Sequence, residues 1–337
     1  MPCPIADVRT ALARFGPDRC ERVSEETARG WANALAWGHY ENFSVLSSLV
    51  PKELRGDFGA VYAFCRWSDD LGDEITEELG GRARSLELLA WWRGELHAAV
   101  AGEPRHPVMV ALAPTIARHA LPVELFDRLI RAFELDQTKD RYATWEELLG
   151  YCRDSADPVG RLVLMMLGEP REEGIFALSD RICTALQLTN HWQDIRRDFA
   201  ERNRLYVPRD MIDAARIEDF DRRLAETIRL GHGCDATFFG QANALVRTLV
   251  ERTWPLFVEG ERIFDMLGPR SRALVWLLAE GGARTLHQIE LWNCETVLHR
   301  PTLSRAAKLW IVMRAWWIAK RQGRIDTRRI LAAGGAA

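Results

Sequence analysis

The sequence has no pair of cysteines at the short C-x-x-C spacing that zinc sites and dithiol redox sites use, although its 337 residues include seven cysteines. It also has no apolar run near the roughly 20 residues that a membrane-spanning helix needs. The first residues lack the basic segment and the apolar run of a secretory signal. These absences predict reduced, mostly packed thiols and a cytoplasmic protein that does not cross a bilayer.

A surplus of positive charge is missing as well. Lysine and arginine number 45 against 48 aspartates and glutamates, and the formal net charge is -3. A protein that neutralises a phosphate backbone needs a basic surplus, so we expect no nucleic-acid partner. Hydrophobic residues make up 47% of the chain, which is enough for a substantial core and excludes intrinsic disorder.

Helical periodicity dominates what the sequence does contain. Apolar residues recur at spacings of three and four, and no stretch keeps a period of two. Helix-start signals include Ser24 before two glutamates, Pro51 before an apolar segment, and Thr144 with Glu147 at capping-box spacing. Because there is no repeat and no long linker, we predict an all-α fold with a single domain over residues 1–323. Residues 324–337 are predicted to form a flexible tail.

Two acidic runs carry the first chemical signal, Asp69-Asp70-Leu-Gly-Asp73 and Asp194-Ile-Arg-Arg-Asp198. On a helix the outer aspartates of each run lie one turn apart on the same face, where they repel each other unless a cation binds. Carboxylates on facing helices suit Mg²⁺, which completes its shell with water and phosphate oxygens. The alternative is a solvated acidic face, because 21 aspartates give about 1.3 such pairs by chance, against three present.

Arginines accompany both acidic runs. Arg66 lies three residues before Asp69, and Arg196 and Arg197 follow Asp194. A helical turn that offers carboxylates to a metal and guanidinium to a phosphate oxygen is matched to a diphosphate. The alternative for each arginine is an ordinary surface ion pair.

The order of these segments resembles the squalene/phytoene synthase family. Its first motif, an arginine three residues before a D-D-x-x-D run, is matched from Arg66 to Asp73. Its second motif resembles residues 186–198, and an Arg-x-Tyr-x-Pro element follows at Arg204–Pro208. The likeness is collinear over about residues 30–315, and all three elements in order are far more specific than either acidic pair.

Three further stretches resemble the hydroxysqualene synthase (HpnC-like) branch of that family. They are His39–Phe43, Tyr151–Arg161 and Arg300–Ser304. One position departs from the family pattern, since Asp154 stands where many members have a tyrosine. Any role of that tyrosine is therefore not carried over to this chain.

The resemblance implies an isoprenoid-synthase helical bundle around a central cavity, with Mg²⁺ as cofactor. The catalytic and metal-binding residues that it implies are Asp69, Asp73, Asp194 and Asp198. The implied diphosphate contacts are Arg66, Asn190, Arg197, Arg204 and Tyr206. The implied cavity residues are Phe43, Phe64, Gln187 and Trp192, with Phe133 as a further candidate. Aromatic residues at helical spacing also fit plain core packing, and Tyr206 fits either role.

The implied reaction is the ionisation and rearrangement of presqualene diphosphate with capture by water, in squalene or hopanoid biosynthesis. The lack of a G-x-G-x-x-G dinucleotide fingerprint favours water over reductive capture. One alternative is a head-to-head prenyl transferase that makes presqualene or prephytoene diphosphate. Another is a non-catalytic helical assembly factor, although all four aspartates are present. The implied partners are the prenyl diphosphate substrate and neighbouring squalene-pathway enzymes.

An aromatic-rich segment flanked by basic residues, residues 308–321, lies near the C-terminal end. Such a segment fits a peripheral membrane contact, because the substrate and product are lipids. It fits a buried terminal helix with exposed basic residues equally simply, and we favour that interpretation.

Overall fold

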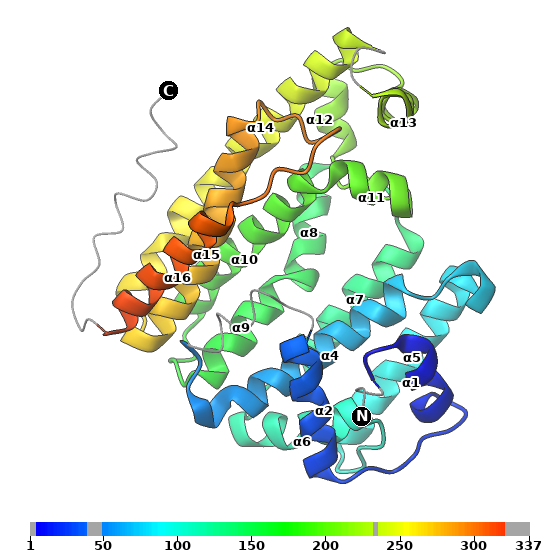
Figure 1. The fold of residues 1–337 in the computed structure, drawn as a ribbon, viewed down its shortest axis with the longest axis vertical. Helices are drawn as coiled ribbons and strands as arrows, with labels where there is room; N and C mark the ends of the chain where they lie inside the picture. Colours follow the sequence, from blue (N-terminus) through cyan, green and yellow to red (C-terminus); the bar gives the residue numbers. More distant parts are fainter. Residues whose placement is uncertain (1–4, 39–48, 232–234, 321–337) are drawn as a thin grey trace. The chain divides into compact units, whose positions relative to one another are not determined.

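The chain folds into helices joined by turns, as the computed structural model in Figure 1 shows. The structure describes residues 5–38, 49–231 and 235–320. Within these ranges there is no strand, and the one β-type pairing is an isolated bridge between Arg141 and Leu205. The predicted all-α class is confirmed.

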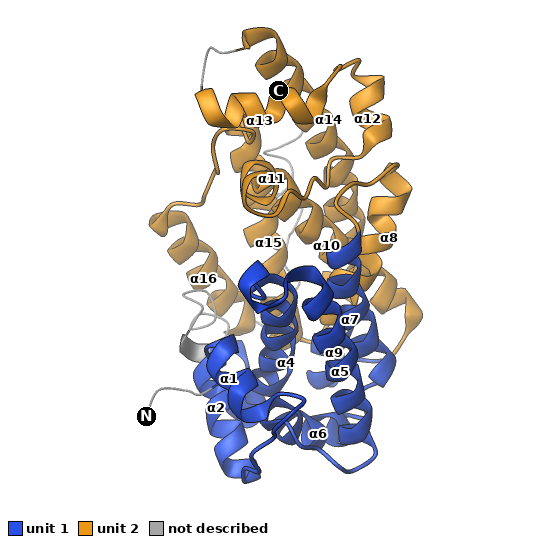
Figure 2. Cartoon of the chain, turned by 90° about the vertical axis from the view of Figure 1, so that its right-hand side faces the viewer, with its two compact units in different colours: residues 1–138, 161–170 blue, residues 139–160, 171–337 orange. Residues whose placement is uncertain are grey.

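Contacts within the chain divide it into two compact units, which Figure 2 draws in different colours. Unit 1 comprises Met1–Thr138 and Arg161–Pro170, and unit 2 comprises Lys139–Gly160 and Arg171–Ala337. The single domain over 1–323 stays a prediction, and the tail over 324–337 lies outside the described residues.

Unit 1 is built around α4 (Arg55–Asp73), which packs against α2, α5, α6 and α7. Its helices are α1 (Val8–Phe15), α2 (Glu25–Gly38), α4, α5 (Gly81–Val100), α6 (Pro107–His119) and α7 (Val123–Thr138), with short 3-10 turns η1 (Lys52–Leu54) and η2 (Glu77–Leu79). Phe64, Trp67 and Leu71 recur at helical spacing on α4 and are fully buried. This apolar stripe fixes which face of α4 turns outward.

An aromatic cluster fills the core of unit 1 around His106. Trp67 stacks on the His106 ring with centroids 5.2 Å apart, and Trp92 meets it edge-on at 4.8 Å. His106 also begins α6, because its Nδ1 accepts the amide proton of Val108. Complete burial lowers the pKa of His106 to about 3, so the ring is neutral in the folded protein.

Unit 2 is built around α10 (Glu173–Gln193), which packs against α8, α14 and α15. Its other helices are α8 (Trp145–Ser155), α11 (Ile195–Arg202), α12 (Arg209–Ala214), α13 (Phe220–Leu230), α14 (Ala236–Gly260), the 3-10 turn η3 (Glu261–Asp265), α15 (Pro269–Leu291) and α16 (Arg305–Lys320). The helix α9 (Asp157–Met166) begins in unit 2 and ends in unit 1.

Two glycines allow close contact between helices of unit 2. A Cβ on Gly282 would overlap Leu186, and one on Gly260 would lie 2.5 Å from Cγ1 of Ile182.

Several local sequence signals are confirmed. Ser24 accepts the amide proton of Thr27 at the start of α2, and Thr144 accepts that of Glu147 at the start of α8. Pro51 immediately precedes η1, which leads into α4. The five described cysteines are free thiols, namely Cys20, Cys65, Cys152, Cys183 and Cys294.

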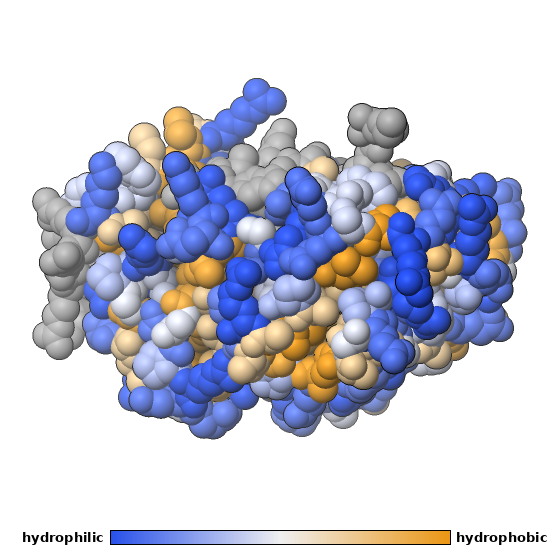
Figure 3. Space-filling model, turned by 90° about the horizontal axis from the view of Figure 1, so that it is seen from below, coloured by the Kyte–Doolittle hydropathy of each residue, from blue (hydrophilic) through white to orange (hydrophobic). Residues whose placement is uncertain are grey.

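Hydrophobic and hydrophilic side chains are interspersed on the face that Figure 3 displays. Among the described helices, none combines the length and the apolar character that crossing a bilayer requires. The segment predicted to be a buried terminal helix is α16, and the structure buries only one of its faces.

Candidate functional site

The first acidic motif occupies the last two turns of α4, in unit 1. The buried stripe of that helix leaves Arg66, Asp69 and Asp73 on the partly exposed side, and 41% of the Asp69 side chain is exposed. Nη1 of Arg66 lies 3.2 Å from a carboxylate oxygen of Asp69, and Nη2 lies 2.5 Å from one of Asp70. The arginine therefore holds two adjacent carboxylates of the motif.

Asp70 is the buried member of this motif. Burial raises its pKa to about 7, and the charges of Asp69 and Glu74 add to that effect, whereas Arg66 opposes it. A spacing of four residues selects Asp69 and Asp73 and does not select Asp70. The packing of α4 is what turns the Asp70 carboxylate inward, and a pairwise spacing does not reveal it.

The second acidic motif lies at a break between two helices in unit 2. Asp194 has φ -107° and ψ 13°, so α10 ends at Gln193 and α11 begins at Ile195. The expectation that Asp194 and Asp198 share one continuous helix is therefore incorrect. The two residues still lie one turn apart, because the Asp198 amide donates to the Asp194 carbonyl oxygen at 2.9 Å.

Two arginines reach the Asp194 carboxylate. Nη2 of Arg197 lies 2.8 Å from Oδ2, and Arg300 donates to the carboxylate through Nε and Nη2, the latter at 3.2 Å. Only 6% of the Asp194 side chain is exposed. A buried carboxylate with a two-point guanidinium contact is fixed in direction, which is the strong form of this ion pair.

The segment that carries Arg300 is fastened to the helix break by its backbone. Arg196 donates to the carbonyl oxygen of Leu298 at 3.2 Å, and Gln193 donates to that of Pro301. A cavity of about 320 Å³ opens beside these residues. It is lined by Gln193, Asp194, Arg196, Arg197, Ala200, Glu201, His299 and Arg300. The cavity thus combines a buried carboxylate with several arginines.

Asp198 lies between positive and negative neighbours. Burial and the charge of Asp194 raise its pKa to about 6, and Arg197, Arg202 and Arg204 work in the opposite direction. The backbone places Arg204 beside it, since the Arg204 amide donates to the Asp198 carbonyl oxygen at 3.0 Å. The structure therefore gathers Asp194, Asp198, Arg197 and Arg204 at this motif, and their roles stay a prediction.

An aromatic stack stands behind the second motif. Tyr206 lies over the His191 ring with centroids 3.8 Å apart, and it also contacts Tyr142 and Tyr151. Complete burial lowers the pKa of His191 to about 3, so this ring is neutral. Both alternatives for Tyr206, phosphate contact and packing, remain, and the stack shows how the ring is held.

The remaining predicted site residues fall in different surroundings. Phe64 is fully buried between Trp92 and Phe126 in unit 1, and Trp192 is fully buried in unit 2, donating to Thr253 at 2.9 Å. Asn190 is exposed and Gln187 is half-buried, on the last turns of α10. Core packing accounts for the contacts of Phe64 and Trp192, and a cavity role for them stays a prediction.

Other predicted positions are placed as follows. Phe133 is half-buried on α7, and Asp154 is half-buried on α8. Phe43 and the rest of the His39–Phe43 stretch lie outside the described residues.

Arg300 is the contact of Asp194 in unit 2 that the sequence does not predict. It lies 106 positions from Asp194 in the chain, so no local spacing connects the two. The signal that was available is the Arg300–Ser304 stretch, which the resemblance singled out without a role. In this structure Arg300 contacts the motif carboxylate of Asp194 at two points.

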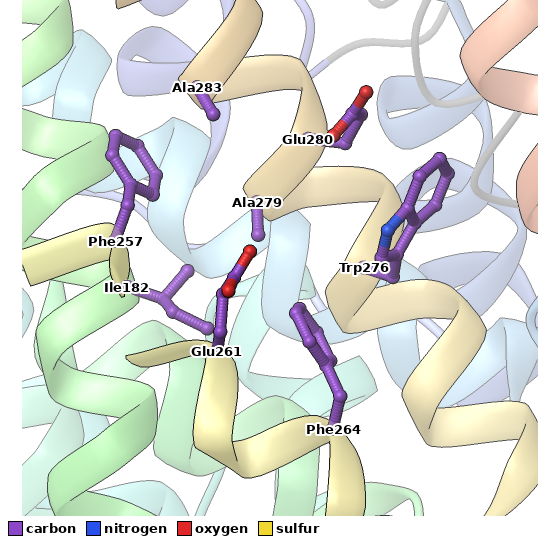
Figure 4. Close-up of a pocket in the computed structure, with 8 residues that line it drawn as sticks. All are labelled: Ile182, Phe257, Glu261, Phe264, Trp276, Ala279, Glu280 and Ala283. Carbon is purple, nitrogen blue, oxygen red and sulfur yellow. The ribbon is translucent and has the colours of Figure 1, made fainter. Parts of the chain in front are cut away.

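A second cavity in unit 2 is small and mostly apolar (Figure 4). It is lined by Ile182, Phe257, Glu261, Phe264, Trp276, Ala279, Glu280 and Ala283. Burial and the nearby Glu280 raise the pKa of Glu261 to about 7. The open space at its centre, about 10 Å³, is close to the room that one water molecule needs. This cavity is therefore no site for a prenyl chain.

The donor set of the two motifs fits the magnesium ion that the resemblance implies. Each motif offers only carboxylate oxygens, the hard ligands that Mg²⁺ takes. In the part of the chain that the structure describes, no three acidic, histidine or cysteine side chains gather into a metal cage. A pair of carboxylates is nonetheless sufficient where waters and substrate phosphate oxygens complete an octahedral shell.

The described residues are helical and carry two arginine-paired aspartate motifs, a combination whose chemistry suits a diphosphate. Comparison with known proteins identifies the family. The family model for squalene/phytoene synthase matches residues 37–307. The chain belongs to the squalene/phytoene synthase family, whose members are enzymes that process prenyl diphosphates.

Relatives within the family include two kinds of synthase. The hydroxysqualene synthase of Rhodopseudomonas palustris is 39% identical over 53% of this chain and 59% of its own length. The phytoene synthase of Thermus thermophilus is 35% identical over 62% of this chain and 69% of its own length. The matched part thus spans less than two thirds of the hydroxysqualene synthase.

A solved structure extends the likeness to the fold. The squalene synthase HpnC of Alicyclobacillus acidocaldarius has a TM-score of 0.70 and 39% sequence identity with this chain. The match covers 80% of this chain and 95% of that one. The predicted isoprenoid-synthase fold class is confirmed.

Proposed function

We propose that this protein is a hydroxysqualene synthase that converts presqualene diphosphate and water into hydroxysqualene and diphosphate, in squalene or hopanoid biosynthesis. The observation that carries the proposal is the set of relatives: hydroxysqualene synthases share 36–39% identity with it over about half the chain. The arginine-paired aspartate motifs support it with matching chemistry. A cytoplasmic location and neighbouring squalene-pathway enzymes as partners belong to the same proposal.

The reaction needs a leaving diphosphate and a protected carbocation. The carbon–oxygen bond to diphosphate breaks, the diphosphate keeps the electron pair, and the cation rearranges. Water then forms a new carbon–oxygen bond and releases one proton. A magnesium ion supplies positive charge for the departing diphosphate when it is bound.

The residues of the chain have separate tasks in this scheme. Asp69 and Asp73 in unit 1, and Asp194 and Asp198 in unit 2, would hold Mg²⁺ through their carboxylate oxygens. Arg66 and Arg197 offer guanidinium groups to phosphate oxygens, in addition to orienting the neighbouring carboxylates. We propose that both motifs are required for the same reaction, so that removal of either abolishes it.

A head-to-head prenyl transferase is the second candidate, and the phytoene synthase relative is the observation that favours it. The two activities differ in the substrate consumed. Purified protein with Mg²⁺ should convert presqualene diphosphate into an alcohol and leave farnesyl diphosphate unchanged. Consumption of farnesyl diphosphate alone would instead identify the transferase, and consumption of neither would favour the helical assembly factor.

A further inference from the structure

The helix α16 is apolar on two sides, and the structure covers only one of them. Ile311, Ala315 and Ile318 are buried, and the helix packs against α15. Five large apolar side chains point outward instead. They are Leu309, Trp310, Met313, Trp316 and Trp317, each exposed by 37–59%. Exposure of large apolar side chains to water is unfavourable. A helix face that gathers several of them therefore marks an interaction surface.

The outward side chains form one stripe bounded by positive charge. Arg305, Leu309, Met313, Trp316 and Lys320 follow one another at spacings of four, four, three and four, so they share a face. The stripe therefore starts and ends with a basic residue, and both of these are exposed. We call the set Arg305, Leu309, Trp310, Met313, Trp316, Trp317 and Lys320 the α16 stripe.

Cations also hold the tryptophan rings in place. Nζ of Lys320 lies 3.5 Å from the ring centroid of Trp316. The ring centroid of Trp310 lies 4.2 Å from the guanidinium carbon of Arg284 and 5.1 Å from that of Arg314. Tryptophan and basic residues on one face are the side chains enriched where proteins meet lipid headgroups. The rings of the stripe are thus already ordered beside positive charge.

The charge of the surrounding sequence points to an anionic partner. Residues 296–325 contain seven lysines and arginines and no aspartate or glutamate, although the chain as a whole carries a net charge of -3. A second copy of the chain would bring like charges together, because a two-fold contact along the stripe pairs its basic ends with each other. Anionic phospholipid matches both the charge and the apolar side chains.

We propose that the α16 stripe docks the protein onto an anionic phospholipid bilayer, with the helix lying in the plane of the headgroups. The 16 residues of α16 extend about 24 Å, which is less than the roughly 30 Å hydrocarbon core, so the helix lies in the surface and does not span it. The stripe is independent of the acidic motifs. This inference therefore goes beyond the proposed reaction.

Vesicle sedimentation of the purified full-length chain tests the proposal. Phosphatidylcholine vesicles that contain phosphatidylglycerol should bind the protein, and vesicles of phosphatidylcholine alone should bind it much less. Trp317→Ser should lower the partition coefficient about tenfold, because it removes a large interfacial side chain. Lys320→Gln should lower it about fivefold on the anionic vesicles only.

Two matched variants serve as controls. Trp292 has the same exposed fraction as Trp317, 47%, but lies outside the stripe, and Arg222 on α13 is an exposed basic residue of unit 2. Trp292→Ser and Arg222→Gln should leave binding within about twofold of the unmodified protein, which is the effect of a surface change away from the contact. Circular dichroism checks that all variants keep their helices.

Three results would overturn the proposal. They are no binding to anionic vesicles, equal losses in the stripe variants and their controls, and a dimer in light scattering that Trp317→Ser dissociates. The last result would make the stripe an interface between copies. The assay contains no prenyl diphosphate, so its failure leaves the proposed reaction standing, and failure of the reaction leaves the docking surface standing.

Discussion

Asp194 receives guanidinium groups from two segments of unit 2, one a single turn along the chain and one 106 residues away. Both contacts restrict the direction of the Asp194 carboxylate. A carboxylate that is to hold a metal ion needs a fixed direction. The orientation of Asp194 therefore depends on Arg197 and Arg300.

Replacing the motif aspartates should remove activity without unfolding the protein. We expect Asp194→Asn to lower turnover at least about a hundredfold, because an amide keeps the shape but loses the charge that holds a cation. Steady-state turnover of presqualene diphosphate measures the effect. Asp213→Asn, an exposed position on α12, is the matched control and should retain full activity.

Arg300 should act through Asp194 as a positioning residue. Arg300→Lys keeps the charge but loses the two-point contact, so we expect kcat to fall about tenfold, with a larger fall for Arg300→Ala. The Mg²⁺ concentration needed for half-maximal activity should rise in the same order. Equal effects of the two variants, or no change in the metal requirement, would contradict a positioning role.

Burial of His106 should make the stability of unit 1 depend on pH. The pKa is about 3 in the folded protein and 6.5 in an ordinary histidine, so the unfolded chain binds more protons between these values. Stability is therefore complete above about pH 6.5 and is lost as the pH falls towards 3. From this group alone the free energy of unfolding should drop by about 2 kcal/mol between pH 6.5 and 5.

Urea unfolding across that pH range checks the prediction. His106→Asn keeps an N-cap acceptor for the Val108 amide and removes the titrating ring, so it should remove the His106 share of the pH dependence and leave that of His191, while lowering stability at pH 7. The same slope in the variant and the unmodified protein would show that another group is responsible.

At the scale of elements, the close contact of α15 with α10 and α14 depends on a single missing side chain. A Cβ at Gly282 would overlap Leu186 and lie 3.1 Å from Cζ of Phe257, whereas one at Gly281 would meet nothing within 4 Å. Gly282→Ala should destabilise the protein by about 1–3 kcal/mol through overpacking. Gly281→Ala should stabilise it by about 0.5–1 kcal/mol, because alanine is the better helix former.

Thermal unfolding of this pair gives a sharp comparison. The two variants differ by one position on the same helix and carry the same substitution. Opposite shifts in Tm support the packing of α15 described above. A rise of similar size in both would mean that the packing at Gly282 is looser than the structure shows.

The sequence predicted the helices and the residues of the acidic motifs better than it predicted the packing around them. Apolar periodicity identified the helical class, and Ser24 and Thr144 were recognisable caps because capping depends on neighbours within a turn. The break at Asp194 was missed, because the residues around it are compatible with a continuous helix. Burial of Asp70 and the reach of Arg300 depend on packing between distant segments, which no local pattern encodes.

At the scale of the whole molecule, the two acidic motifs belong to different compact units of the chain. Among the described residues, each motif alone offers too few ligands for a metal cage, so a bound Mg²⁺ would need water and substrate oxygens to complete its shell. If one reaction requires both acidic motifs, each unit is inactive without the other. Asp69→Asn in unit 1 should therefore lower turnover as severely as Asp194→Asn in unit 2, and the double variant should show little further loss.

Incorporation of labelled oxygen tests the central claim most directly. The protein is incubated with Mg²⁺ and presqualene diphosphate in oxygen-18 water, without nicotinamide, and the product is analysed by mass spectrometry. We predict an alcohol that carries one labelled oxygen atom, and no conversion by Asp69→Asn or Asp194→Asn. An unlabelled product, a hydrocarbon, or full activity in either variant would contradict the account.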